Sequence, residues 1–164
     1  MREGESETSR LVRAGTCEPG LFAEVAADAG ATRGALCVVF GVALAAGIGH
    51  LPAGGLAGLL SGSARWLVAW VVWLFAVHLG ALALGRPSEL SRLFRSLGYA
   101  SVPFALGAFE WIPLLGALVW LAKWGIGFFA FTTATREALE LENSTAALLC
   151  AVGLLLAAAT LRIL

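Results

Sequence analysis

Two ionisable side chains, a lysine and a histidine, lie inside long apolar stretches. They are the residues of this sequence whose side chains could bind a ligand or transfer a proton. Lys123 lies within the apolar residues 114–135, and His78 lies within the apolar residues 66–84. A charged group in the interior of a bilayer is costly, so each such residue needs a functional hypothesis by default. Lys123 could reach the outer surface, pair with Glu110 at the boundary of its segment, or face a partner subunit. We favour a structural pairing or a subunit contact over transport.

His78 could relay protons or bind haem. A haem normally has a second protein ligand, and no second histidine lies in the interior of an apolar segment. We therefore expect a hydrogen-bonded, structural role for His78.

Motifs for other chemistry are missing from the sequence. It contains no GxSxG, HExxH or phosphate-binding GxxxxGK[ST] pattern, and no Asp or Glu in the interior of an apolar segment. Cys17, Cys37 and Cys150 form no CxxC or Cys/His pattern, which disfavours a disulfide framework and a zinc site. Eleven basic residues balance eleven acidic ones, so no strong field attracts nucleic acid. We expect no catalytic residue, no metal, no cofactor and no enzymatic activity.

The composition places most of the chain in a membrane. Hydrophobic residues make up 59% of the 164 residues and charged residues 13%, with a mean hydropathy of +0.85. A soluble domain of this length cannot hide so much apolar surface. We predict an all-α, polytopic transmembrane helix bundle over residues 34–164, preceded by a polar head over residues 1–33.

Five segments approach the roughly 20 apolar residues that a bilayer requires. They are residues 34–50, 66–84, 93–111, 114–135 and 145–161. The third is short and contains Pro103. Because only residues 110–113 separate the third from the fourth, these two could instead form a re-entrant pair.

The polar head contains a short amphipathic helix within residues 21–29. Leu21, Phe22 and Val25 share one face, while Glu24 and Asp28 lie four residues apart on another. Such a helix could lie on the membrane surface. Its polar face is acidic, so we favour packing against the bundle or against a partner.

The distribution of arginine predicts the orientation. With the N-terminus inside, the inner segments contain eight arginines and the outer ones only Arg65 and Arg162. The excess of arginine over lysine, with abundant Ala, Gly and Leu, favours a GC-rich bacterial genome. We expect a multi-pass protein of the bacterial inner membrane, with its N-terminus in the cytoplasm and its C-terminus outside.

Two rows of residues are candidates for helix contacts. Gly41, Ala45 and Gly49 repeat every four residues along the first segment, a spacing that permits close helix packing. Trp66, Trp70 and Trp73 share one face of the second segment. A pigment or quinone site could use this row, but we favour packing or lipid contact.

The run from Leu97 to Pro103, Leu-Gly-Tyr-Ala-Ser-Val-Pro, resembles a motif of the YIP family of Ypt/Rab-interacting membrane proteins, in particular its small bacterial members. The likeness extends over roughly residues 20–162. It implies a five-helix bundle with a cytoplasmic N-terminus. The chain lacks the Asp-Leu-Tyr-Gly-Pro motif of the eukaryotic members, so Rab binding is not carried over, and the bacterial likeness supplies no reaction.

The motif also makes physical sense as a packing device. Gly98 permits close approach of helices, and Tyr99 places a hydroxyl near the inner interface. Pro103 frees a backbone carbonyl that Ser101 or a neighbouring helix must help to satisfy.

These features favour a non-enzymatic protein that acts by binding, as a scaffold, assembly factor or accessory subunit of a membrane complex. Its expected partners are membrane lipid and either another membrane protein or further copies of itself. The alternative is a small transporter or channel for a neutral solute. That function requires a water-filled cavity connecting His78, Lys123 and Pro103.

Overall fold

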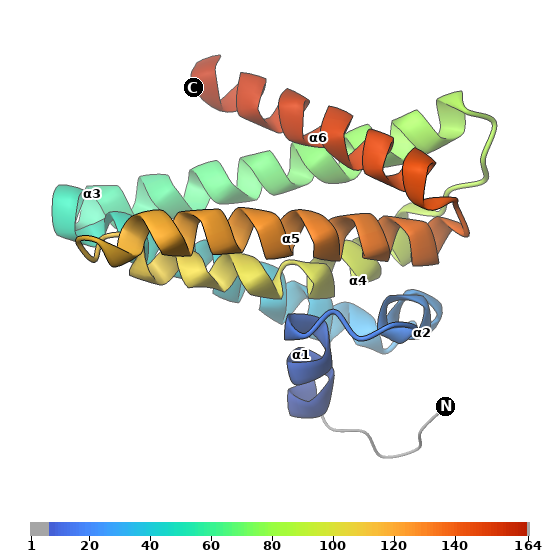
Figure 1. Cartoon of the computed structure of the whole chain (residues 1–164), viewed down its shortest axis with the longest axis horizontal. Helices are drawn as coiled ribbons and strands as arrows, with labels where there is room; N and C mark the ends of the chain where they lie inside the picture. Colours follow the sequence, from blue (N-terminus) through green and yellow to red (C-terminus); the bar gives the residue numbers. More distant parts are fainter. Residues whose placement is uncertain (1–6, 164) are drawn as a thin grey trace.

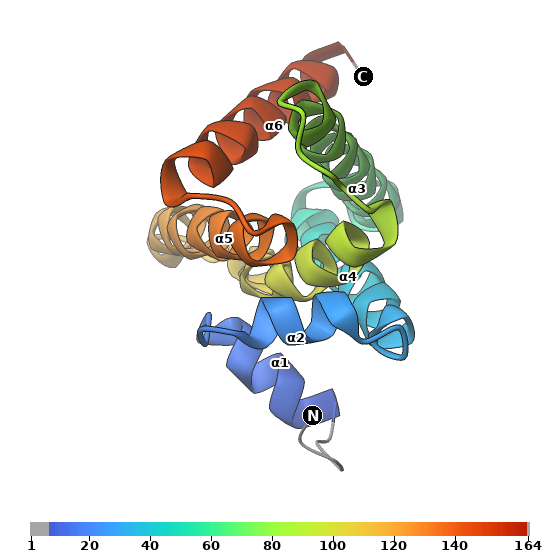
Figure 2. The same ribbon diagram turned by 90° about the vertical axis from the view of Figure 1, so that its right-hand side faces the viewer.

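The computed structural model describes residues 7–163, and over these residues the protein is all-α, with seven helices (Figures 1 and 2). They are α1 (Glu7–Gly15), α2 (Leu21–Ala27), α3 (Ala31–Ala83), α4 (Leu90–Ala100), the 3-10 helix η1 (Val102–Phe109), α5 (Leu115–Leu139) and α6 (Asn143–Ile163). Helices α3, α5 and α6 are long and apolar enough to cross a membrane. The predicted all-α class is confirmed. Residues 1–6 of the predicted head, including Arg2, lie outside the described residues.

Helix α3 folds back on itself at Gly55. This residue has φ 56° and ψ −144°, a conformation that glycine adopts without a steric penalty, and Pro52 lies three residues before it. The two arms then run in opposite directions, close together at the turn and farther apart toward their other ends (Figure 1). A Cβ atom on Gly62 in the second arm would lie 3.1 Å from the Cα atom of Gly47 in the first. The predicted segments 34–50 and 66–84 are thus the two arms of one helical hairpin.

The third predicted segment consists of α4 and η1. Pro103 has no N–H group to donate within a helix, and the Phe104 N–H donates instead to the Ser101 carbonyl at 2.9 Å. A 3-10 helix rises about 2.0 Å per residue and an α-helix about 1.5 Å, so α4 and η1 together extend about 32 Å. The change of helix type therefore gives a short segment nearly the length of α6.

Connections gather at the two ends of the bundle (Figure 1). One end, here called the head end, carries α2 and the connections at residues 84–89 and 140–142. The opposite end, here called the tip end, carries the turn of α3 at Gly55 and the connection at residues 110–114. The arms of α3, the α4–η1 segment, α5 and α6 run alternately between these ends.

Aromatic side chains fill the middle of the bundle. The rings of Trp73 and Phe131 lie 4.5 Å apart between centroids, and Phe104 lies 5.3 Å from Phe131, both in edge-on contact. The outer surface is also apolar, with Phe40 60%, Leu118 65% and Leu155 69% exposed. A surface of this kind is stable when lipid covers it.

Candidate functional site

An aromatic cavity of about 270 Å³ lies toward the tip end of the bundle. Both arms of α3, the end of η1, α5 and α6 contribute to its wall. Five of the six tryptophans line it, and these are Trp66, Trp70, Trp73, Trp120 and Trp124. The row of three tryptophans along the second segment therefore faces a cavity within the bundle.

Lys123 and Glu110 form an ion pair in the wall of this cavity. The Lys123 Nζ atom lies 2.6 Å from the Glu110 Oε1 atom, and the side chains are 13% and 22% exposed. Nζ also lies 5.6 Å from the centre of the Trp124 ring, within the range of a cation–π interaction. Of the alternatives open for Lys123 from the sequence, the structure contains the pairing with Glu110.

Arg65 and His50 add two further polar groups to the wall. The Arg65 Nη2 atom donates to the carbonyl of Leu161, in the last turn of α6, at 3.1 Å. The His50 Nδ1 atom lies 2.9 Å from the carbonyl of Ala46 in its own helix. The cavity thus combines an extended aromatic surface with a few convergent polar groups, which is typical of small-molecule sites.

His78 lies elsewhere in the bundle. Its Nδ1 atom is 2.8 Å from the Ser88 hydroxyl, in the connection at the head end. Among the described residues, neither His78 nor Pro103 lines the aromatic cavity. The two ionisable residues singled out in the sequence are therefore not brought together.

Three residues of the Leu97–Pro103 motif, namely Gly98, Tyr99 and Ser101, make defined contacts near the junction of α4 and η1. A Cβ atom on Gly98 would lie 2.8 Å from the Ala35 Cβ atom, so α3 and α4 cross closely there. Tyr99 is fully buried, and its hydroxyl donates to the Glu7 carboxylate at 2.6 Å. The Ser101 hydroxyl accepts from the Trp70 indole N–H and donates to the carbonyl of Leu97.

The small residues of the first segment differ in their surroundings. A Cβ atom on Gly49 would lie 2.2 Å from the carbonyl oxygen of Gly107 in η1, so this position requires glycine. Ala45 is half-buried, and Gly41 faces open space, with no atom within 4 Å of such a Cβ. Of these three positions, only Gly49, the one nearest the tip end, is in close contact with a neighbouring segment.

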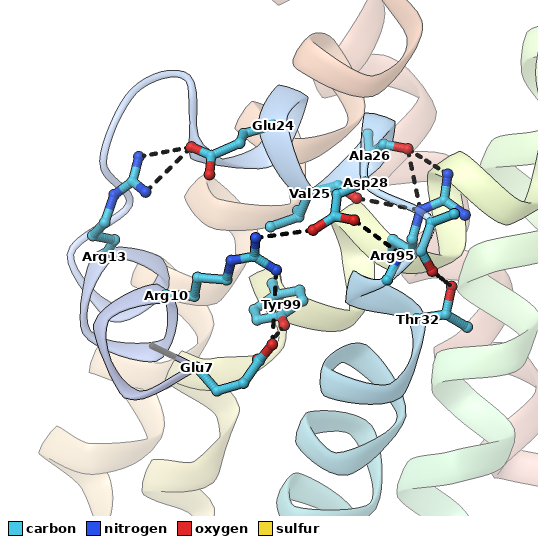
Figure 3. Close-up of polar contacts among 12 residues, drawn as sticks. Glu7, Arg10, Arg13, Glu24, Val25, Ala26, Asp28, Thr32, Arg95 and Tyr99 are labelled. Carbon is cyan, nitrogen blue, oxygen red and sulfur yellow. Dashed lines mark hydrogen bonds and ion pairs between the residues drawn. The ribbon is translucent and has the colours of Figure 1, made fainter. Parts of the chain in front are cut away.

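Helix α2 is fixed to the bundle by charged side chains at both of its ends. The Glu137 carboxylate of α5 accepts from the N–H groups of Gly20 and Ala23 at its N-terminus. The Arg95 guanidinium of α4 donates through Nε to the carbonyls of Val25 and Ala26 at its C-terminus (Figure 3). A carboxylate at the N-terminus and a cation at the C-terminus satisfy unpaired backbone groups and oppose the helix dipole.

Helix α1 is held to α2 by ion pairs (Figure 3). Arg10 Nη2 lies 2.9 Å from Asp28 Oδ2, and Arg13 Nη1 lies 3.2 Å from Glu24 Oε2. Burial by itself raises the pKa of Asp28, but hydrogen bonds from Arg10 and from the Gly30 N–H outweigh this effect and hold the pKa below its usual value. We call α1 and α2 together, residues 7–28, the N-terminal head.

Sequence reasoning missed three charged residues with defined contacts. Arg95 lies in the predicted third segment and is only 7% exposed, yet only Lys123 and His78 drew attention as ionisable residues in the apolar segments. Arg65 was counted only among the outer arginines, and no contact was expected of Glu137. Their partners lie 69 to 117 residues away in the chain, so no local spacing identifies them.

Comparisons with protein-family models, with curated proteins and with solved structures gave no match. The resemblance to the YIP family therefore depends on the sequence motifs alone.

Proposed function

We propose that this is a polytopic protein of the bacterial inner membrane that acts by binding, as a scaffold, assembly factor or accessory subunit of a membrane complex. One observation carries the proposal. Several charged and polar groups of the bundle are engaged in contacts that join its elements to one another and to the N-terminal head. Such contacts stabilise an arrangement of surfaces, which is what a binding protein presents to its partner.

The positions of His78 and Lys123 favour binding over transport. His78 contacts Ser88 at the head end, while Lys123 contacts Glu110 at the tip end. A solute path using both would have to extend along the whole bundle, and the aromatic cavity includes only Lys123 of the two. Among the described residues, the aromatic cavity therefore does not by itself connect the groups that the transport alternative would use.

The arrangement of segments supports five crossings. Each arm of α3 contains more than 20 residues, and α4 with η1 extends about 32 Å, close to the roughly 30 Å thickness of the hydrocarbon core. Five arginines lie at the head end, and these are Arg33, Arg86, Arg92, Arg95 and Arg136. The positive-inside rule places this end in the cytoplasm and the C-terminus outside.

The N-terminal head is the surface that we assign to a protein partner. Its inner side is bound to α4 and α5, whereas Leu11 and Val12 of α1 face outward and are 38% and 63% exposed. Because the ion pairs fix α1 before any partner arrives, binding costs less conformational entropy than ordering a flexible tail would.

Purification from the native membrane in mild detergent tests this proposal. We expect a second polypeptide at fixed stoichiometry. A photo-crosslinking residue at position 12 should capture it, and one at position 142, exposed at the same end but outside the head, should not. A monodisperse species with the mass of one chain, together with no crosslink from position 12 in intact membranes, would contradict the proposal.

A further inference from the structure

We infer that the aromatic cavity binds a single-chain amphiphile with a monoanionic head group, which enters from the outer leaflet of the membrane. The inference concerns the tip end of the bundle: the choice of leaflet rests on the proposed orientation, whereas the binding itself does not depend on the partner assigned to the N-terminal head.

The charges in the wall of the cavity select an anion. Lys123 is neutralised by Glu110 at 2.6 Å, whereas Arg65, among the described residues, forms no ion pair with a carboxylate. Its guanidinium has five N–H donors and uses one nitrogen to bind the Leu161 carbonyl. The wall therefore carries one uncompensated positive charge with unused donors. A carboxylate or phosphate monoester anion would complement both the charge and the donors.

The size of the cavity selects one acyl chain. Its volume of about 270 Å³ lies just below the range of about 300–1,000 Å³ that is usual for small-molecule sites. Trp73 lies eight residues further from the tip end than Arg65, and Phe131 lies eight residues further from it than Lys123. Eight residues correspond to about 12 Å along a helix. A polar head beside Arg65 would thus direct a single apolar chain between the aromatic rings.

The position of the mouth indicates how the ligand enters. Arg65 binds the last turn of α6, so its guanidinium lies at the level where that helix ends. Helices α5 and α6 diverge from the turn that connects them (Figures 1 and 2). Trp120, which is 55% exposed, and Leu161 line the cavity on these diverging helices. An amphiphile in the outer leaflet could therefore enter sideways, with its head at the interface.

The test uses tryptophan fluorescence, because five of the six tryptophans line the cavity. The full-length protein is placed in phosphatidylcholine nanodiscs and titrated with 11-bromoundecanoate, whose bromine quenches tryptophan on contact. The matched neutral probe is 11-bromoundecanol, and concentrations are expressed per bilayer lipid. The pH is kept alkaline so that the carboxylate is ionised.

We expect saturable quenching by the acid. Its apparent affinity should exceed that of the alcohol about ten-fold or more, because one charge-assisted hydrogen bond provides a gain of this size. Arg65→Gln should abolish this preference, and Arg65→Lys, which keeps the charge, should retain most of it. Arg162→Gln, which removes an exposed arginine of α6, should leave it unchanged. Undecanoate should displace the probe, and acetate should not.

Equal affinities for the acid and the alcohol would overturn the inference and favour a neutral ligand. An unchanged preference in Arg65→Gln would overturn it as well. Displacement by acetate at the same concentration as by undecanoate would indicate a site for small anions instead. If Arg65→Gln does not fold, as judged by circular dichroism, the acid-to-alcohol ratio in the native protein still decides whether the cavity prefers an anionic amphiphile.

Discussion

At the scale of single residues, Lys123 and Glu110 show how the protein places charge in an apolar environment. Each alone would lose its hydration without compensation, whereas together they form a close ion pair between the end of η1 and α5. The net contribution of a buried pair is often small, but removal of one member leaves the other charge buried and unpaired. The pair thus fixes the connection at residues 110–114 against the first turns of α5.

Substitution of one member of the pair should therefore cost more than substitution of both. We expect Lys123→Met to lower the free energy of unfolding by about 3–5 kcal/mol, because Glu110 is left unpaired. The double variant Lys123→Met/Glu110→Gln should recover most of the loss. Denaturation of the purified protein in detergent, followed by circular dichroism, measures both. Equal losses in the single and double variants would show that the pair does not act as a unit.

Asp28 predicts a dependence on pH at the N-terminal head. Since its pKa is lowered in the folded state by Arg10 and by the Gly30 N–H, its contribution to stability is complete above the unfolded pKa of about 4. That contribution is lost as the pH falls through the folded pKa. The Tm of the native protein should exceed that of Asp28→Asn at neutral pH, and the difference should shrink below about pH 4. A difference that stays constant over this range would contradict the assignment.

At the scale of the elements, the crossing of α3 and α4 depends on the lack of a side chain at Gly98. The space there is occupied by Ala35, whereas Gly41 in the same arm of α3 faces open space. Two glycines within helices, both chosen from the sequence as packing residues, thus have different surroundings. The same substitution at each separates packing from helix propensity.

We expect Gly98→Ala to lower the Tm, because its Cβ atom would lie 2.8 Å from that of Ala35 and the helices would have to separate. Gly41→Ala should leave the stability unchanged or raise it by up to about 1 kcal/mol, since alanine favours the helix. Thermal denaturation in detergent measures both variants. A Tm for Gly98→Ala at or above that of Gly41→Ala would refute the close crossing.

The docking of α2 can be tested at its N-terminal cap. Glu137→Ala leaves the N–H groups of Gly20 and Ala23 without their acceptor, which costs about 0.5–2 kcal/mol for a helix cap. Amide hydrogen exchange over residues 21–27 should become faster in this variant. Glu142→Ala, which removes an exposed carboxylate of the head end, should leave this exchange unchanged. Equal exchange in the two variants would show that Glu137 does not hold α2.

Elements with long apolar runs could be predicted from the sequence, and contacts between distant residues could not. The apolar run from residue 66 to 84 predicts a buried or lipid-facing helix, and it is helical as far as Ala83. Pro103 indicated an irregularity, but the 3-10 helix that follows was not predicted. The helix over residues 21–27 followed from its periodicity. The attachment of this helix to the bundle could not be predicted, because Arg95 and Glu137, which hold it, are remote from it in the chain.

At the scale of the whole molecule, the two ends of the bundle differ in character. The head end gathers arginines and carries the N-terminal head, whose charged groups are largely paired with the bundle or with each other. The tip end carries the aromatic cavity and its single ion pair. In the orientation that we propose, partner binding belongs to the cytoplasmic side and amphiphile binding to the outer leaflet. Both assignments require that the arms of α3 cross the membrane separately.

Cysteine accessibility in intact cells tests that requirement most directly. Single cysteines are introduced, after replacement of Cys17, Cys37 and Cys150, at exposed positions of the two ends, Ala53 and Pro113 at the tip end and Ser91 and Asn143 at the head end. A membrane-impermeant maleimide should label positions 53 and 113 in intact spheroplasts. It should label positions 91 and 143 only after the membrane is permeabilised. Labelling of positions 53 and 91 from the same side would contradict the separate crossing of the two arms, and with it the assignment of the two ends to opposite faces of the membrane.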